Sequence, residues 1–535
     1  MLARLSVRPS SLSLPGRMAT HRVSMVSQHL STSSSRPAAP TSAAAPDSAP
    51  VADPPVVFEA EHSLRKVILN RPKALNSLND AMVDLILPQL SKYEQSDLAN
   101  VVVIKSNSKH FCAGGDVVSL AKSLDKESEW KKASAFFKKE YVMNHFLATM
   151  SKPVVSLMKG VAFGGGLGLS MHGAFRVATE TTQVAMPETK IGLFPDVGAN
   201  FFLPRLDGQL GIYLALTSVP LKGAGAYFAG FTSHYVPAER LAALEQRLAE
   251  LDAAATVDDV NAALNEYAAD ADELASALAQ YPLVGPVRRA LDHVFSRATA
   301  EEMMATLAAI ESDSLAPEVG QSILRGAGPA DHDVVRRWAK ETREQIELRS
   351  PTSVKLSIKA IREGAKLNIE EVLAMDNRIA AACCSPSVHT DFRTGVTEFL
   401  INKVKPEDQR PAWSPATLGD VSLASIQQTF FASPLPFSNP PVPAFRPHQA
   451  RKDRVNALAP YKVHPYARFG LPTERAIEAV VKGESKDSPD FAQTRTEIVE
   501  RFEREYSGKV GVREKVNEVL DRRTVVAEEN TLRWV

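Results

Sequence analysis

Two carboxylates lie eight residues apart in this chain, shortly after a run of four glycines. The carboxylates are Glu188 and Asp196 in PETKIGLFPDVG, and the glycines lie in FGGGLG at residues 163–168. Glycine lets a substrate approach the main chain closely and leaves N–H groups free to hold a developing oxyanion. Acidic side chains beside such a hole suit proton transfer or attack on a carbonyl. The pattern therefore predicts acyl chemistry at a thioester or an ester.

A second glycine cluster, FCAGGD at residues 111–116, also follows a predicted strand. Taken alone, FGGGLG would fit a tight turn with close backbone packing, because its spacing matches neither G-x-G-x-x-G nor a P-loop. Two glycine turns at corresponding strand ends can instead each supply one N–H to a shared oxygen. Cys112 lies among apolar and small residues, so we interpret it as buried packing rather than as a nucleophile.

Composition excludes several classes of function. The 535 residues are enough for two or more units, since single cores stop growing near roughly 250–300 residues. With 62 basic and 62 acidic side chains the formal net charge is zero. No global field therefore favours nucleic acid or an anionic membrane. We expect neither a membrane nor sequence-specific binding of nucleic acid.

The cysteines and the apolar runs indicate which further kinds of site and structure to expect in this chain. Cys112, Cys383 and Cys384 are too few for a disulfide framework, and no Cys/His group has zinc-ligand spacing. We therefore expect no metal site. No apolar run approaches the roughly 20 residues that are needed to span a bilayer.

The first fifty residues are basic and rich in serine. Five arginines precede the first acid, Asp47. This composition is typical of an organellar presequence. Residues 1–50 are therefore predicted to be a mitochondrial presequence and a disordered linker. The alternative is a basic tail without a targeting role.

Residues 51–245 alternate short apolar runs with helical periodicity. VVFEAEHSLRKVILNRP predicts two short strands around a polar turn, and AMVDLILPQLSKYEQ predicts a helix capped by Asn79 or Asp80. The β-branched runs at 101–106 and 153–160 are typical of strands buried on both faces. The alternation predicts an α/β unit.

The amino-acid composition changes twice in the rest of the chain. Residues 246–405 are rich in alanine and leucine at helical spacing, which predicts a helical region that serves packing. Residues 406–450 are dense in proline, which predicts a semi-rigid linker. Residues 451–535 predict a helical C-terminal extension. It is too small to bury much core alone, so we expect it to dock on something.

Three helices are predicted in the extension. Thr473 caps the first, and the third follows Gly511. The middle helix is predicted to open at Ser488, with Pro489 at its first helical position and Asp490 after it. Its apolar face consists of Ile498, Val499, Phe502 and Tyr506.

Several motifs resemble the enoyl-CoA hydratase/isomerase (crotonase) superfamily, and more narrowly its 3-hydroxyisobutyryl-CoA hydrolase family: NRPKALNSL, FCAGGD, FGGGLGLSMHG and MPETKIGLFPDVGA. The resemblance runs from about Val56 to Pro415 and includes SPTSVKLS, EEVLAMDNRIA, DFRTGV and the region of Trp413. It implies an α/β fold with a crotonase-like ββα spiral core, followed by a mainly helical region and the C-terminal helical extension.

The resemblance also implies a reaction. In that superfamily two backbone amides polarise a thioester carbonyl, and these match Gly115 and Gly165. One of the two catalytic glutamates of the hydratases matches Glu188, whereas the other falls at Gly168, which has no side chain. The resemblance therefore implies hydrolysis of 3-hydroxyisobutyryl-CoA to 3-hydroxyisobutyrate and coenzyme A, as in valine catabolism, rather than alkene hydration. Coenzyme A is then part of the substrate, and no cofactor is implied.

The hydrolase members also share the spacing of Glu188 and Asp196, and a substrate-contacting glutamate that matches Glu140 in KKEY. Glu188 would attack the carbonyl or activate water as a general base, and the sequence does not separate the two. Asp196 would orient the water or the substrate hydroxyl. Two plainer roles stay open: Asp196 as the cap of a turn, and Glu140 on a solvated helix face.

The stretch HPYARFGLPTERAIEAVVKGES resembles tails of fungal homologues that are constituents of the mitochondrial small ribosomal subunit. It implies a second function, a structural or moonlighting ribosomal component on a hydrolase scaffold, and a location in the mitochondrial matrix. The aromatic side chains that we expect to be exposed are Tyr461, Tyr466, Phe469 and Trp534. The cations that we expect to contact RNA or an acidic protein surface are Arg451, Lys452, Arg454, Arg468, Arg522 and Arg523. The alternative is that the extension packs back onto its own catalytic region.

Overall fold

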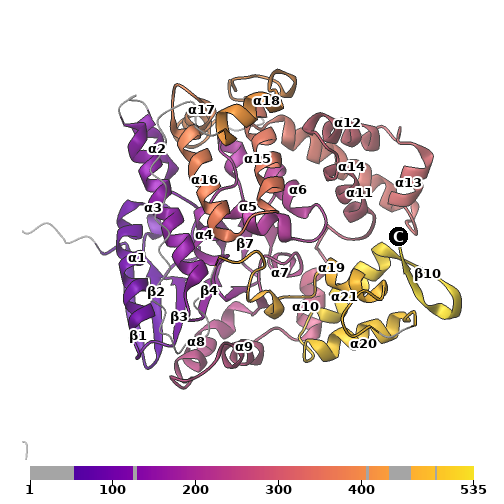
Figure 1. The fold of residues 1–535 in the computed structure, drawn as a ribbon, viewed down its shortest axis with the longest axis horizontal. Coiled ribbons are helices and arrows are strands. Elements are labelled where there is room, and N and C mark those ends of the chain that lie inside the picture. Colours follow the sequence, from indigo (N-terminus) through magenta and orange to yellow (C-terminus); the bar gives the residue numbers. More distant parts are fainter. Residues whose placement is uncertain (1–52, 125–128, 405–408, 433–459, 489–490) are drawn as a thin grey trace, which may run out of the picture. The chain divides into compact units, whose positions relative to one another are not determined.

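A computed structural model describes residues 53–124, 129–404, 409–432, 460–488 and 491–535 (Figure 1). The presequence predicted at residues 1–50 lies outside the described residues, and so does most of the proline-dense stretch. Among the described helices, none combines the length and the apolar character that crossing a membrane requires.

The main sheet has six strands in the order β1-β2-β3-β4-β6-β9. β1 and β2 pair antiparallel, and every later pair of neighbours is parallel. The predicted strands are confirmed, and the apolar residues of β3 and β4 are buried, as expected for strands that are covered on both faces. The strands are β1 (Val56–Glu61), β2 (Leu64–Leu69), β3 (Val101–Ser106), β4 (Val154–Met158), β6 (Phe175–Ala178) and β9 (His234–Tyr235).

A smaller sheet of three strands adjoins the glycine turns. β5 pairs parallel with β7, and β7 pairs antiparallel with β8. Cys112 N donates to Val161 O at 2.9 Å, and Phe163 N donates to Cys112 O at 3.0 Å. These bonds hold FCAGGD beside the strand that leads into FGGGLG. The strands are β5 (Val161–Phe163), β7 (Gln183–Ala185) and β8 (Leu221–Lys222).

Helices cover the α/β part, and α3 packs against α1, α2, α4 and α16. The Asn79 side chain accepts the Met82 N–H and so caps α1, as predicted. In Figure 1, α1 and α3 run beside the strands of the main sheet. The helices of this part are α1 (Asp80–Gln95), α2 (Val117–Leu124), α3 (Trp130–Thr149), α4 (Gly165–Ser170), α5 (Ala199–Phe202), α6 (Leu210–Thr217) and α7 (Ala224–Phe228).

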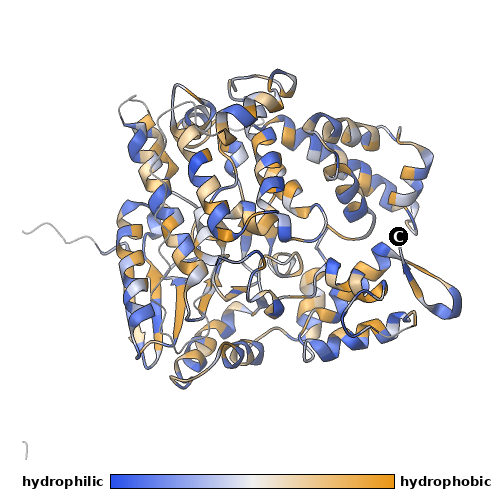
Figure 2. Ribbon diagram, viewed as in Figure 1, coloured by the Kyte–Doolittle hydropathy of each residue, from blue (hydrophilic) through white to orange (hydrophobic). Residues whose placement is uncertain are grey.

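The predicted helical region follows. Capping boxes at Thr256, Asp270, Thr299 and Asn368 start α9, α10, α12 and α16. Figure 2 shows hydrophobic and hydrophilic faces on these helices, which is the pattern of helices that bury one side. They are α8 (Leu241–Ala249), α9 (Val257–Glu266), α10 (Ala271–Leu278), α11 (Gly285–Phe295), α12 (Ala300–Glu311), α13 (Pro317–Ile323), α14 (Pro329–Glu347), α15 (Pro351–Gly364), α16 (Ile369–Cys384) and α17 (Asp391–Val396).

Residues 409–432 differ from the semi-rigid linker that their prolines predict. Trp413 and Phe430 are buried, and the Trp413 indole donates to Leu348 O at 3.1 Å. A short helix, α18 (Leu423–Ile426), packs against α15. Proline content predicts a stiff chain, but it does not reveal whether the apolar side chains between the prolines have a surface on which to pack.

The described residues of the C-terminal extension form three α-helices and a hairpin. Thr473 caps α19 and Gly511 precedes α21, as predicted. The predicted start of the middle helix at Ser488 is wrong, because α20 begins after Thr494, in a capping box with Glu497. This box satisfies two donors, whereas a simple serine cap satisfies one. The elements are α19 (Glu474–Val481), α20 (Arg495–Glu505), α21 (Val512–Arg523), β10 (Thr524–Val526) and β11 (Leu532–Trp534).

The extension docks on the chain that precedes it. Ile498 and Phe502, on the predicted apolar face of α20, belong to one buried cluster with Tyr227 and Phe228 of α7. The Tyr227 hydroxyl also donates to Val510 O at 2.7 Å. Of the two fates that the sequence leaves open for this face, the structure therefore favours packing on its own chain.

The prediction of exposed aromatic side chains in the extension is wrong. Tyr466 and Phe469 are buried, and the Phe469 ring centroid lies 5.0 Å from that of Phe175 in β6. Tyr461 packs edge-on against Phe201 at 5.4 Å, and Trp534 is half-buried. The sheet and α5 supply the apolar surface on which these rings pack, and a sequence pattern does not display that surface.

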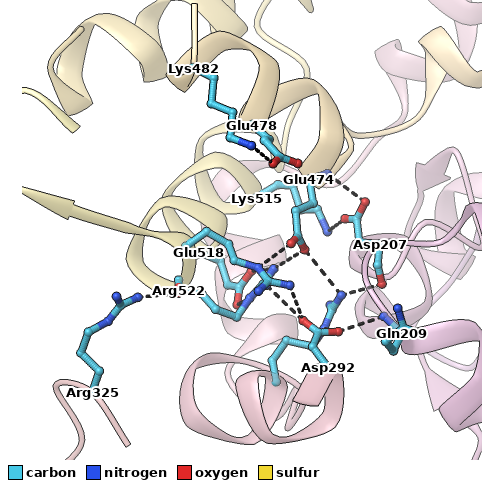
Figure 3. Close-up of polar contacts among 12 residues, drawn as sticks. Asp207, Gln209, Asp292, Arg325, Glu474, Glu478, Lys482, Lys515, Glu518 and Arg522 are labelled. Carbon is cyan, nitrogen blue, oxygen red and sulfur yellow. Dashed lines mark hydrogen bonds and ion pairs between the residues drawn. The ribbon is translucent and has the colours of Figure 1, made fainter. Parts of the chain in front are cut away.

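An ionic network joins the extension to α11 and to the loop before α6 (Figure 3). The Arg522 side chain is 0% exposed and pairs with Glu474 at 2.8 Å and with Asp292 at 3.3 Å. Lys515 pairs with Asp207 at 2.7 Å. Acidic side chains of the preceding chain thus form ion pairs with cationic side chains of the extension.

This network corrects the expectation that the cations of the extension meet RNA. Arg522 is buried and paired, and Arg523 also pairs with Asp292, at 2.9 Å. Arg468 is exposed but pairs with Asp258 at 2.9 Å. The other three cations of that expectation lie outside the described residues: Arg451, Lys452 and Arg454.

Candidate active site

The two glycine turns lie against each other. A Cβ placed on Gly165 would lie 3.2 Å from Gly115 N. Gly164 adopts a φ of +43°, which glycine tolerates and which turns the chain from β5 into α4. In the described part of the chain, neither the Gly115 N–H nor the Gly165 N–H donates to another group. Two amide donors are therefore available side by side.

Glu140 and Glu188 flank the FGGGLG turn. A Cβ on Gly165 would lie 2.5 Å from Glu140 Oε1, and a Cβ on Gly164 would lie 2.5 Å from Glu188 Oε1. Any larger residue at either glycine would displace a carboxylate. Glu140 is only 1% exposed, so it does not lie on a solvated helix face. Within the described chain, Glu140 Oε1 and Glu188 Oε2 have no hydrogen-bond partner.

Asp196 joins these carboxylates from the loop before α5. It is 4% exposed, and its carboxylate accepts a hydrogen bond from the Tyr141 hydroxyl at 2.6 Å. Its carbonyl closes a turn by accepting the Ala199 N–H at 2.8 Å. Tyr141 follows Glu140 directly, so one turn of α3 both supplies a carboxylate and holds another.

The loop that carries Asp196 is anchored by α16. Asp376 accepts hydrogen bonds from Gly198 N at 2.9 Å and from Asn200 Nδ2 at 2.7 Å. Val197 has a φ of +53°, a strained conformation for a β-branched residue. Such strain persists only where the surroundings hold it, and it is common at functional sites. The anchors fix the direction of the Asp196 side chain.

Burial shifts the pKa values of all three carboxylates upward. It raises the pKa of Glu140 and of Glu188 well above the usual range, and the nearby charge of Asp196 raises both further. Burial raises the pKa of Asp196 to about 7, against the opposing effect of the Tyr141 hydrogen bond. Asp196 therefore titrates near neutral pH, which suits general acid and base chemistry.

Gly168 lies at a closed position. A Cβ there would lie 2.8 Å from Val197 Cβ and 3.0 Å from Asn144 Nδ2. A glutamate side chain would have to displace both neighbours. The position at which the resemblance places the second hydratase glutamate therefore has no room for one.

The cysteines take no part in this cluster. Cys112 is buried, and burial raises the pKa of its thiol to about 12, which confirms the interpretation of this residue as packing. Cys383 and Cys384 are buried and free. Over the described residues, no group of three or more His, Cys, Asp or Glu is arranged to hold a metal ion.

The arrangement is suited to acyl transfer. Two adjacent amide donors can polarise a carbonyl, and buried carboxylates with raised pKa values can attack it or move a proton. A family model described as enoyl-CoA hydratase/isomerase matches residues 64–430. The chain belongs to this family. The match includes both glycine turns and the three carboxylates, and it also includes most of the stretch that its prolines predict as a linker.

Curated relatives fall into two groups. The chain is 38% identical over 377 residues to "3-hydroxyisobutyryl-CoA hydrolase, mitochondrial" of Danio rerio, covering 70% of this chain and 89% of the relative. The human protein of the same name is 36% identical over 376 residues, covering 70% and 88%. "Small ribosomal subunit protein mS47" of Neurospora crassa is 38% identical over 476 residues, covering 88% of this chain and 85% of the relative.

Solved structures of the family confirm the predicted crotonase-like α/β fold. A carnitinyl-CoA dehydratase from Mycobacterium thermoresistibile aligns with a TM-score of 0.57 and 30% identity over 73% of this chain and 98% of its own. An enoyl-CoA hydratase from Rhodobacter sphaeroides aligns with a TM-score of 0.56 and 27% identity over 70% and 96%. The helices that follow the core match the predicted order of a helical region and a helical extension.

The structure brings together all five residues predicted for the site: Gly115, Glu140, Gly165, Glu188 and Asp196. The sequence reasoning missed Tyr141 and Asn144, which lie on α3 beside this cluster. Helical spacing from Glu140 was a signal for Asn144, because residues four positions apart lie on the same face of a helix, whereas Tyr141 carried no such signal.

Proposed function

We propose that the protein hydrolyses the thioester of 3-hydroxyisobutyryl-CoA to 3-hydroxyisobutyrate and coenzyme A. The observation that carries the proposal is the pair of carboxylates Glu188 and Asp196 beside two free amides, at a position where Gly168 leaves no room for a second hydratase glutamate. The named relatives support the substrate, and they match most of their own length.

In the proposed mechanism the thioester carbonyl oxygen accepts hydrogen bonds from Gly115 N–H and Gly165 N–H. The negative charge that develops on this oxygen is stabilised there, by roughly 3–4 kcal/mol per donor. Glu188 either attacks the carbonyl carbon to give a mixed anhydride, which water then opens, or removes a proton from a water that attacks directly. In both routes the C–S bond breaks and the thiolate leaves with coenzyme A.

Asp196 and Glu140 complete the proposed cycle. Asp196, held by Tyr141, orients the attacking water or passes its proton to the leaving thiolate. Glu140 contacts the substrate beside Gly165. Burial raises the pKa of Glu140 well above its usual range, and the nearby charge of Asp196 raises it further.

A thiol-release assay on a panel of acyl-CoAs tests this function. We expect release of coenzyme A from 3-hydroxyisobutyryl-CoA and no hydration of crotonyl-CoA. Parallel assays with 3-hydroxypropionyl-CoA and isobutyryl-CoA define the preference for the acyl group. Hydration of crotonyl-CoA without thiol release from any thioester would contradict the proposal.

A second function is a role in the mitochondrial small ribosomal subunit. The match to the Neurospora ribosomal protein covers 88% of this chain, and residues 1–430 alone cannot fill that share, so it includes part of the C-terminal extension. The apolar face of the extension is occupied by its own chain, so a ribosomal partner would meet the opposite, solvent-facing side. We expect the full-length protein to co-sediment with small subunits at low salt, and its absence from that fraction would contradict this role.

The cellular location follows from both functions. The hydrolase relatives are mitochondrial by name, and the ribosomal relative supports the same organelle for this chain. We place the protein in the mitochondrial matrix, where acyl-CoA substrate and ribosome would both be reached. Fractionation of mitochondria into matrix and membranes tests the location.

A further inference from the structure

Asn144 is the polar side chain of the site to which the proposed mechanism gives no role. It lies on α3 and is 0% exposed, and in the described chain neither its Oδ1 nor its Nδ2 has a hydrogen-bond partner. A buried polar group without a partner is costly, and most such groups in proteins are paired. An amide that keeps both its donor and its acceptor free at this depth is suited to a ligand.

The neighbours of Asn144 place it close to the reacting groups. Its amide lies beside Gly168, and Val197, which follows the catalytic aspartate, lies beside the same glycine. Gly168 is about one turn along α4 from Gly165, and Asn144 is one turn along α3 from Glu140. One turn advances about 5.4 Å, a separation that the acyl chain from the thioester carbonyl to a hydroxyl on the third carbon can bridge together with the hydrogen bonds at its two ends.

We propose that Asn144 recognises the 3-hydroxyl of the acyl group, with Nδ2 donating to the hydroxyl oxygen and Oδ1 accepting its proton. This inference rests on the proposed hydrolase function and names the feature by which the site selects its substrate. A carboxamide and a hydroxyl can each donate and accept a hydrogen bond, so they match as a pair. Glu140 Oε1 lies beside Gly165, where the thioester carbonyl of the substrate would bind. Asn144 would then contact the hydroxyl of the acyl group.

The test compares two substrates that differ only in the hydroxyl. Thiol release from 3-hydroxyisobutyryl-CoA and from isobutyryl-CoA is measured for the full-length protein and for Asn144→Leu, which keeps the branching at Cγ but removes both polar atoms. We expect kcat/KM for the hydroxylated substrate to fall about 10–100-fold, as when a buried polar group loses its partner. We expect kcat/KM for isobutyryl-CoA to change less than about threefold, so that the preference collapses.

Three controls separate the possible results. The melting temperature of Asn144→Leu should equal or exceed that of the wild type, since no protein contact is lost, and Asn144→Ala serves if the leucine variant does not fold. Equal losses on both substrates, or no loss on either, would overturn the inference and leave the hydrolase function standing. If no thioester is cleaved at all, calorimetric binding of the two corresponding thioethers still decides whether Asn144 discriminates the hydroxyl.

Discussion

Two of the places where the molecule buries acidic side chains shift their pKa values in opposite directions. At the seam with the extension, burial alone would raise the pKa of Glu474, but the charges of Arg522 and Arg523 lower it to about 2. At the candidate active site, burial raises the pKa of Asp196 to about 7, and no cation among the described residues offsets this rise. The degree of burial is similar, so the difference lies in the partners.

The comparison separates two uses of a buried acid. A carboxylate surrounded by guanidinium groups stays ionised and holds two segments together, and removing one partner leaves a buried charge without compensation. A carboxylate without a cation exchanges its proton near neutral pH and costs stability when it ionises. The seam therefore serves docking, and the cluster around Glu188 serves chemistry.

The largest effect is expected from Glu188→Gln. This change keeps the size of the side chain and removes the charge needed for attack or for activation of water. We expect kcat for thiol release to fall at least about 100-fold, as for other general acid–base groups, while the melting temperature stays equal or rises. A stable variant with unchanged turnover would show that another residue carries out the chemical step.

The converse change is Arg522→Met at the seam. Its removal takes a fully buried cation from Glu474 and Asp292, which keep Arg288 and Arg523 as partners. We therefore expect a loss of about 3 kcal/mol in the free energy of unfolding, the lower end of the range for a broken buried pair. Arg468→Met is the matched control, since its exposed pair with Asp258 contributes at most about 1 kcal/mol. Urea denaturation measures both, and equal losses would show that the network is not what holds the extension.

The two regions should also respond to pH with opposite signs. The raised pKa of Asp196 means that its contribution to stability is present below the ordinary value of 3.8 and is lost as the pH rises through about 7. Asp196→Asn should therefore be more stable than the wild type above about 7. Glu474 contributes to stability above its ordinary pKa of 4.5, and this contribution is lost as the pH falls toward about 2. Glu474→Gln should therefore be less stable than the wild type at neutral pH, and the difference should disappear at low pH.

Tyr141→Phe should give the smallest effect and sharpen the comparison. The hydroxyl lowers the pKa of Asp196, so its loss should move the acid limb of the pH–rate profile to higher pH. We expect kcat at neutral pH to fall about tenfold, the equivalent of about 1.4 kcal/mol. An unchanged acid limb would mean that Asp196 does not titrate in the rate-limiting step.

The sequence predicted those parts of the fold that local patterns determine. The run 101–106 begins with four β-branched residues and forms β3 with the same bounds. The caps at Asn79 and Thr473 were visible in the same way. The start of α20 was also visible, because Thr494 and Glu497 have the spacing of a capping box, but the Ser-Pro-Asp triplet offered a competing start.

What the sequence could not predict depends on contacts between distant segments. Asp292 and Arg522 are 230 positions apart, so their pairing leaves no local signal. Asn144 is an ordinary helical residue until Gly168 and Val197 are placed beside it. The five residues predicted for the site were recognised through family motifs, whereas the burial of Glu140 and the hydrogen bond that holds Asp196 required the coordinates.

The position of Arg522 in α21 ties the fold to the order of protein synthesis. Asp207 and Asp292 are made well before their partners Lys515 and Arg522, and 230 positions separate Asp292 from Arg522. A chain shortened before α21 keeps every residue of the candidate active site, yet Asp207 loses Lys515, Asp292 keeps Arg288 but loses Arg522 and Arg523, and an apolar surface is uncovered. Such a product would be a substrate for quality-control proteases even though its catalytic residues were intact.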